Sequence, residues 1–242
     1  KEQRLHSRLQ EHGLSPRRKL LLVGPPGTGK TMTAAVLAGE LGIPLFLVRL
    51  DTLITKFMGE TAAKLRQVFD AVSSVRGIYF FDEFDAIGSQ RGLANDVGEI
   101  RRVLNSFLQM IEQDQSNSVI IAATNHPEIL DYALFRRFDD VIEYGLPDQA
   151  LITAMLKGRL AGFMSTKSIW KKATDQAVGL SYADIARAAD EAIKNAIIHE
   201  QTSITEADLI ETLAERKQMS AKLTGNKENG RLTNHAGSGS TR

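Results

Sequence analysis

Residues 24–31 have the composition and spacing of a phosphate-binding loop. The segment reads Gly-Pro-Pro-Gly-Thr-Gly-Lys-Thr and stands between the apolar run 20–23 and a helical pattern over 32–41. Glycines let successive backbone N–H groups converge on phosphate oxygens, and the N-terminus of the following helix attracts the same anion. The order strand, loop, helix is the one that such a loop requires. We therefore expect this segment to bind a nucleoside triphosphate.

The loop residues have separate expected roles. Lys30 is expected to reach the outer phosphates and to act in catalysis, and the Thr31 hydroxyl is expected to bind Mg²⁺. ATP and Mg²⁺ are thus the expected ligands, and the alternative is a glycine- and proline-rich turn without a ligand. The expected nucleotide-binding residues are Gly24, Pro25, Pro26, Gly27, Thr28, Gly29, Lys30, Thr31 and Met32.

Two carboxylates follow the apolar run Ile-Tyr-Phe-Phe at 78–81. Asp82 and Glu83 stand at the carboxyl end of this expected buried strand, where parallel sheets place ligands. With a phosphate-binding loop upstream, Asp82 is expected to hold Mg²⁺, either directly or through the ligands of the ion. Glu83 is the expected base that polarises the attacking water. Two acids that simply end a strand are the alternative.

Another polar side chain follows the apolar run 119–124. Asn125 is expected to orient the attacking water and to sense the terminal phosphate. The alternative is that it caps the turn before Pro127, as asparagine often does.

The segment Lys56, Phe57, Met58 and Gly59 leads into a helical pattern over 61–72. An aromatic residue and a methionine normally belong to a core. The adjacent glycine and the following helix favour a loop tip instead, where an exposed aromatic side chain contacts a partner. Spacing alone leaves both interpretations open.

Five apolar runs alternate with helical patterns, which predicts an α/β fold with a doubly wound parallel sheet. From Pro147 onward only helical periodicity remains, which predicts a small all-helical lid domain. The expected strands lie at 20–23, 45–48, 78–81, 119–124 and 141–144. The expected domains are 1–146 with an N-terminal helix within 1–16, the lid at 147–218, and a flexible tail at 219–242.

Composition excludes several classes of protein. Lys+Arg 30 against Asp+Glu 29 gives a net charge of +1, so no global field favours nucleic acid or an anionic membrane. There is no cysteine, which excludes disulfides and thiolate metal sites, and no apolar run reaches the length of a membrane span. A cytoplasmic location is expected. A chain that begins at Lys1 is expected to lack its natural start.

Four segments together resemble AAA ATPases, in the group that includes katanin, spastin and the proteasomal ATPases. They are 24–31, 80–85, Ala-Thr-Asn at 123–125 and Ala-Leu-Phe-Arg-Arg-Phe-Asp at 133–139. Their order and spacing are typical of that family, and the resemblance extends over about residues 14–216. It implies a P-loop NTPase fold and ATP hydrolysis coupled to the remodelling, unfolding or disassembly of protein substrates.

The resemblance also implies partners. Family members form homo-oligomeric rings, typically hexamers, and each nucleotide lies between neighbouring subunits. Arg136 and Arg137 match arginine fingers that reach into the next subunit's site. Residues 56–59 match a pore loop that grips an extended polypeptide, which favours a functional role for Phe57. Residues 179–184 resemble the lid motif that packs near the nucleotide.

The sequence also departs from the family pattern. Arg136 and Arg137 are adjacent, whereas many members separate the two arginines, so the identity of the finger stays open. No convincing adenine-contacting aspartate-glycine-leucine segment occurs in residues 1–19. Two alternative functions remain: a nucleotide-gated scaffold or regulator of a partner such as a protease, and a DNA loader ATPase. Near-neutral charge and an aromatic pore loop disfavour the loader.

Overall fold

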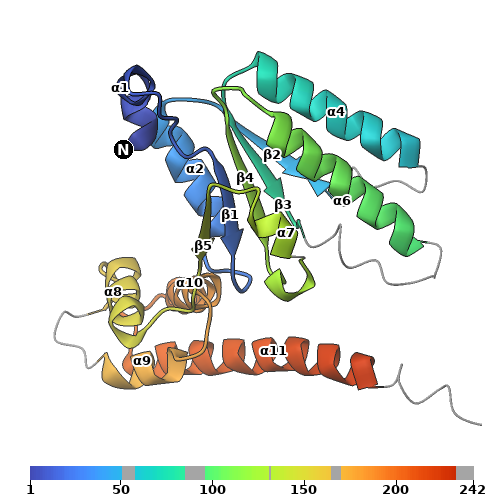
Figure 1. The fold of residues 1–242 in the computed structure, drawn as a ribbon. Coiled ribbons are helices and arrows are strands. Elements are labelled where there is room, and N and C mark those ends of the chain that lie inside the picture. The colour runs from blue at the N-terminus through green and yellow to red at the C-terminus, as the bar shows by residue number, and fades with distance from the viewer. Residues whose placement is uncertain (51–57, 85–95, 131, 165–169, 233–242) are drawn as a thin grey trace, which may run out of the picture. The chain divides into compact units, whose positions relative to one another are not determined.

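The computed structural model describes residues 1–50, 58–84, 96–130, 132–164 and 170–232 (Figure 1). The chain divides into two compact units, Lys1–Gly145 and Leu146–Arg242. The first unit contains a five-stranded sheet, and the elements described in the second are helices.

The sheet of the first unit has the strand order β2-β3-β4-β1-β5, and all neighbouring strands are parallel. The predicted doubly wound parallel sheet is therefore confirmed. Its central strand β4 is buried along its whole length, whereas the edge strands β2 and β5 are largely exposed. The strands are β1 Lys19–Val23, β2 Leu45–Arg49, β3 Ile78–Asp82, β4 Val119–Thr124 and β5 Asp140–Glu143.

Helices cover both faces of this sheet (Figure 1). Successive strand residues point to opposite faces, so Leu21 and Leu22 are both fully buried but belong to different cores. One face packs on α2 (Lys30–Leu41), and the other packs on α4 (Met58–Ser74) and α6 (Asp96–Gln113). The other helices that the structure describes in this unit are η1 Glu2–Leu5, α1 His6–Glu11, η2 Pro127–Ile129 and α7 Tyr132–Phe135.

Glycines fix both ends of α2. Gly29 precedes the helix and Gly42 follows it, and both have left-handed backbone geometry, which glycine adopts without steric cost. Helix α4 begins at Met58, three residues before the expected start at 61. Glu60 in its first turn favours this earlier start, because a carboxylate stabilises the positive end of a helix.

In the second unit, the residues that the structure describes form helices around a core of their own. Small alanines on α10, including Ala188 and Ala192, are fully buried there and let neighbouring helices approach closely. Asp148 and Ser181 cap α8 and α10 by accepting backbone N–H groups. The helices are α8 Gln149–Arg159, α9 Lys171–Ala177, α10 Tyr182–Ile198 and α11 Glu206–Leu232.

Helix α11 continues beyond the expected start of the tail at 219. It is helical through Leu232, so the expectation of a tail without structure needs correction for residues 219–232. Glycine and asparagine there weaken a helix, but Ala221, Lys222 and Leu223 favour it. Extending an existing helix also avoids the cost of nucleation.

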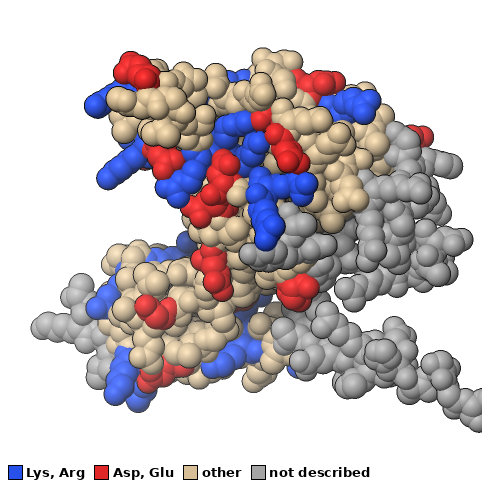
Figure 2. Space-filling view, viewed as in Figure 1, with Lys and Arg blue, Asp and Glu red and all other residues tan. Residues whose placement is uncertain are grey.

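Basic residues of the first unit lie beside acidic ones (Figure 2). Arg17 pairs with both Glu2 and Asp140, and Arg18 pairs with the buried Asp114. The basic residues at 17 and 18 are thus neutralised locally rather than gathered into a patch that would attract nucleic acid. Within the described ranges, no helix is both long and apolar enough to span a bilayer.

Candidate functional site

The loop between β1 and α2 is shaped by its glycines. Gly24, Gly27 and Gly29 all have positive φ, at 143°, 75° and 101°. A Cβ on Gly24 would lie 2.2 Å from the carbonyl oxygen of Tyr144, so only glycine fits at the start of the loop. The loop then opens directly into the N-terminus of α2, where backbone N–H groups and the helix dipole favour an anion.

Lys30 is buried at the base of this loop, with only 7 % of its surface exposed. Its Nζ donates to the carbonyl oxygens of Gly24 and Pro25 at 2.7 and 2.8 Å and to Asn125 Oδ1 at 2.8 Å. An ammonium group only donates, so the amide oxygen of Asn125 must face it and the amide N–H groups point away. The lysine therefore joins the loop to the end of β4.

A second set of contacts joins α2 to β3. Thr31 Oγ1 donates to Asp82 Oδ2 at 3.4 Å, and Asp82 Oδ1 accepts the backbone N–H of Glu83 at 2.9 Å. Glu83 itself is exposed and has a left-handed backbone with φ of 54°. Such geometry is uncommon for residues other than glycine and is concentrated at functional sites.

The strand order explains why these distant segments meet. Strands β3, β4 and β1 are neighbours and parallel, so their carboxyl ends share one edge of the sheet. The backbone N–H of Phe84 donates to Ala123 O at 2.9 Å, which fixes the end of β3 against β4. The arrangement brings together Lys30, Thr31, Asp82, Glu83 and Asn125, which were predicted from three separate motifs.

The donor set of this edge fits a magnesium nucleotide. Ammonium and backbone N–H groups suit phosphate oxygens, while a hydroxyl and a carboxylate are oxygen ligands that Mg²⁺ prefers. No group of three or more His, Cys, Asp or Glu side chains suited to a metal occurs among the described residues. Mg²⁺ does not need one, because it commonly keeps several waters and takes one or two protein ligands plus phosphate oxygens.

The expected arginine fingers follow α7. Arg136 is exposed, whereas Arg137 is partly buried and its Nε donates to Glu112 Oε2 on α6 at 3.1 Å. Of the expected pore loop, Lys56 and Phe57 lie outside the described residues. Met58 and Gly59 form the first turn of α4.

Tyr144 and Thr33 were not singled out in the sequence. The Tyr144 hydroxyl donates to Thr33 Oγ1 at 2.7 Å, and Thr33 Oγ1 donates to Gly29 O at 3.1 Å. The position of Tyr144 after an apolar run suggested only a strand residue. The contact depends on β5 lying beside β1, which no local pattern reveals.

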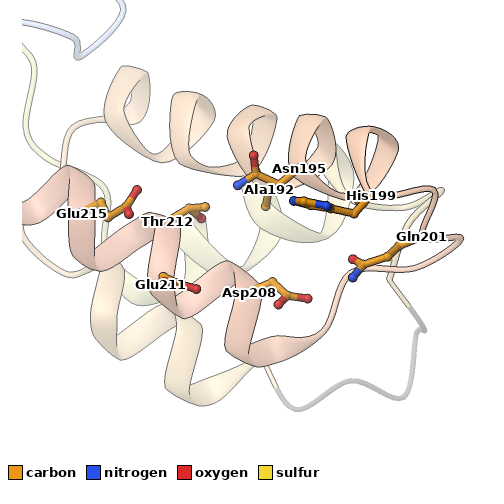
Figure 3. A pocket seen from close by; sticks show the side chains of 9 residues that line it. Ala192, Asn195, His199, Gln201, Asp208, Glu211, Thr212 and Glu215 are labelled. Atoms are coloured by element: carbon orange, nitrogen blue, oxygen red, sulfur yellow. The ribbon is translucent and has the colours of Figure 1, made fainter.

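The helical unit contains a pocket of about 290 Å³ between α10 and α11 (Figure 3). Its wall includes Asn195 from α10, His199 directly after that helix, and three carboxylates from α11, Asp208, Glu211 and Glu215. Hydrogen bonds from the Thr205 hydroxyl and backbone N–H lower the pKa of Asp208. The pocket has none of the phosphate-binding features found in the first unit, and we assign it no function.

Comparison with known proteins agrees with this geometry. Residues 20–146 match the model of the family described as ATPase family associated with various cellular activities (AAA). This range extends from β1 through β5 and includes the whole site at the sheet edge.

Several relatives resemble the chain over most of its length. It is 40 % identical over 228 residues to the "Uncharacterized AAA family ATPase y4kL" of Sinorhizobium fredii, covering 92 % of this chain and 68 % of that protein. It is 36 % identical to the "ATP-dependent zinc metalloprotease FtsH 1" of Methylacidiphilum infernorum, covering 95 % of this chain and 38 % of the relative. For the FtsH of Rhodococcus erythropolis the identity is 38 %, over 86 % of this chain and 25 % of the relative.

The chain therefore spans about two thirds of the first relative and well under half of the two metalloproteases. The family match includes the loop, both carboxylates and the asparagine whose contacts are described above. Together these findings identify the chain as a member of the AAA family and as an ATPase.

Proposed function

We propose that this ATPase works in a ring of identical subunits and uses ATP hydrolysis to remodel or unfold protein substrates. The nucleotide-binding part of this proposal rests on one observation, the cluster at the sheet edge. There Lys30 joins the loop to Asn125, and Thr31 contacts Asp82. Relatives named ATP-dependent metalloproteases support coupling of ATP use to work on proteins.

In this proposal the residues act as follows. Lys30 and the loop N–H groups hold the phosphates, and Thr31 and Asp82 hold Mg²⁺. The ion supplies positive charge that stabilises the transferring phosphoryl group when it is bound. Glu83 accepts a proton from the attacking water, and Asn125 orients that water through its amide N–H groups.

Arg136 is our choice for the arginine finger. Arg137 makes an ion pair with Glu112 of its own chain at 3.1 Å, which holds its guanidinium beside α6. Arg136 is the more exposed of the two and so is better placed to reach a neighbouring subunit. An arginine finger is worth about 10³ to 10⁵ in rate, or roughly 4 to 7 kcal/mol of barrier.

The test is ATP turnover per subunit over a wide range of protein concentration, with Glu83→Gln as the blank. Specific activity should rise with concentration, because the site is completed by a neighbour. Arg136→Ala should abolish this rise, whereas Arg137→Ala should retain it in part. Concentration-independent turnover by a protein that remains monomeric on a sizing column would contradict the ring.

Glu83→Gln tests the assignment of the base. It should bind ATP as the wild type does and turn it over far more slowly, because the amide cannot accept a proton. Fast hydrolysis by this variant would show that Glu83 is not the catalytic base.

Phe57→Ala separates a motor from a nucleotide-gated scaffold. A motor that threads its substrate should keep basal ATPase activity and lose substrate processing. Unchanged processing would favour the scaffold. The placement of Phe57 on a pore loop, the hexameric state and the grouping with katanin and spastin stay predictions from the sequence.

A further inference from the structure

Tyr144 contacts both ends of the phosphate-binding loop. Its carbonyl oxygen lies so near Gly24 that a Cβ there would come within 2.2 Å. Its hydroxyl donates to Thr33 Oγ1 at 2.7 Å, and Thr33 Oγ1 in turn donates to Gly29 O at 3.1 Å. One residue thus contacts the first glycine of the loop directly and the last through one hydroxyl group.

Tyr144 is itself firmly held. Its ring packs against the core between the sheet and α2, and its backbone N–H donates to Val23 O at 2.8 Å. Val23 is the last residue of β1 and the one from which the loop departs. The side chain therefore reaches the loop from a backbone position that is fixed to the same strand.

Tyr144 is also the last residue before the connection to the helical unit. Gly145 ends the first unit and Leu146 begins the second. Gly145 and Leu146 are exposed, and a Cβ at Gly145 would meet nothing within 4 Å. The fixed end of this connection is the residue that contacts the phosphate loop.

We propose that Tyr144 is a positioning residue that holds the phosphate loop through Gly24 and Thr33 and couples the loop to the connection at 145–147. The inference rests on the proposed nucleotide site, and it gives Tyr144 no direct contact with the reacting atoms. When bound phosphates reduce the mobility of the loop, Tyr144 would in turn reduce the mobility of residues 145–147.

The experiment compares Tyr144→Phe, Thr33→Val and the double variant in the full chain. Both substitutions keep the shape of the side chain and remove one hydroxyl. Tyr79→Phe is the matched control, because its hydroxyl donates to the carbonyl oxygens of Ala71 and Val75 at 2.8 and 3.0 Å, away from the loop. The measurements are the affinity for a fluorescent ADP analogue with Mg²⁺ and the thermal midpoint without nucleotide.

Each single substitution should weaken nucleotide binding roughly threefold to tenfold, the range for one neutral hydrogen bond. The double variant should bind nucleotide with about the same affinity as the weaker-binding of the two single variants, because both substitutions break the same chain of hydrogen bonds. Tyr79→Phe should lower the thermal midpoint and leave the affinity unchanged.

Unchanged affinity in Tyr144→Phe would overturn the inference, and so would independent effects that multiply in the double variant. An equal loss of nucleotide affinity in Tyr79→Phe would show that the effect comes from general stability, and it would also overturn the inference. Absence of binding by the wild type would instead refute the proposed nucleotide site, so the two failures are distinguishable.

Hydrogen exchange at Gly145 and Leu146 tests the coupling separately. Saturating nucleotide should slow exchange of these amides in the wild type and not in Tyr144→Phe. Equal slowing in both proteins would show that the connection senses nucleotide by another route and would reject the coupling.

Discussion

Gly24 shows how closely the phosphate loop is packed. Its φ of 143° is rarely adopted by other residues, and an added Cβ would meet backbone, the carbonyl of Tyr144, at 2.2 Å. A backbone atom cannot swing aside as the end of a flexible side chain can. The loop path and the end of β5 are therefore adapted to each other.

Gly24→Ala should cost several kcal/mol of stability or displace the loop, because strain and overpacking add. We expect loss of detectable nucleotide binding, measured by fluorescence titration. Gly39→Ala is the control: Gly39 lies within α2 with nothing within 4 Å of an added Cβ. Alanine there should raise stability by about 0.5 to 1 kcal/mol and leave binding intact. Normal binding by Gly24→Ala would contradict the close packing.

Lys30 donates to the Asn125 side chain as well as to the loop carbonyl oxygens, so a charge placed at position 125 should change how firmly Lys30 is held. Asn125→Asp replaces a neutral acceptor at 2.8 Å with a carboxylate, whose negative charge attracts the ammonium more strongly. The added negative charge would also repel phosphate. Nucleotide affinity should therefore fall in the order wild type, Asn125→Ala, Asn125→Asp. Tighter binding by the aspartate than by the alanine variant would show that Lys30 does not face the phosphates.

Among the helices, α8 and α10 are joined by a bidentate ion pair. Arg159 Nε and Nη2 donate to the two carboxylate oxygens of Asp190 at 2.6 and 2.7 Å. Hydrogen bonding to Arg159 lowers the pKa of Asp190 from its usual 3.8. Both side chains are more than 40 % exposed, so solvent screens the pair.

Asp190→Asn should cost about 0.2 to 1 kcal/mol near pH 7, or about 1 to 8 °C in the midpoint of the helical unit. Because the folded pKa is depressed, the contribution is complete above the unfolded value of about 4 and is lost as pH falls through the lower folded value. The two proteins should therefore converge in midpoint as the pH falls from the unfolded value through the lower folded value, and high salt should narrow the gap at pH 7.

Glu191→Gln on the same helix is the matched control, since Glu191 pairs only weakly with Lys194 at 3.5 Å within α10. It should shift the midpoint less than Asp190→Asn. An equal shift would mean that charge on α10, rather than the bridge to α8, stabilises the unit.

Local patterns predicted the sheet well. Continuous apolar runs marked all five strands within about one residue, for example 78–81 against the observed Ile78–Asp82. The late end of α11 was missed because glycine and asparagine weaken a helix without forbidding it.

The contacts between motifs were less predictable. Sequence order placed the loop, the carboxylates and Asn125 at strand ends, and the parallel sheet then brings them to one edge. The left-handed backbone of Glu83 and the hydrogen bond from Tyr144 to Thr33 depend on which strands are neighbours. No pattern within a single segment carries that information.

At the scale of the molecule, the chain has separate hydrophobic cores in its two units. The sheet unit has one core on each face, and the helical unit has its own core. The phosphate loop and the carboxylates all belong to the sheet unit. Stability gained from nucleotide should therefore appear mainly in that unit.

Calorimetry should resolve two unfolding transitions, of which nucleotide raises mainly the one that belongs to the sheet unit. At a nucleotide concentration of 100 times the dissociation constant the gain is about 2.7 kcal/mol, or roughly 5 to 10 °C. Ile152→Val and Ile121→Val assign the transitions, because both side chains are buried, in the helical and the sheet unit respectively. Each should lower its own transition by about 0.5 to 1.5 kcal/mol. If nucleotide raised both transitions equally, the helical unit would share directly in the free energy of nucleotide binding, and the prediction would be wrong.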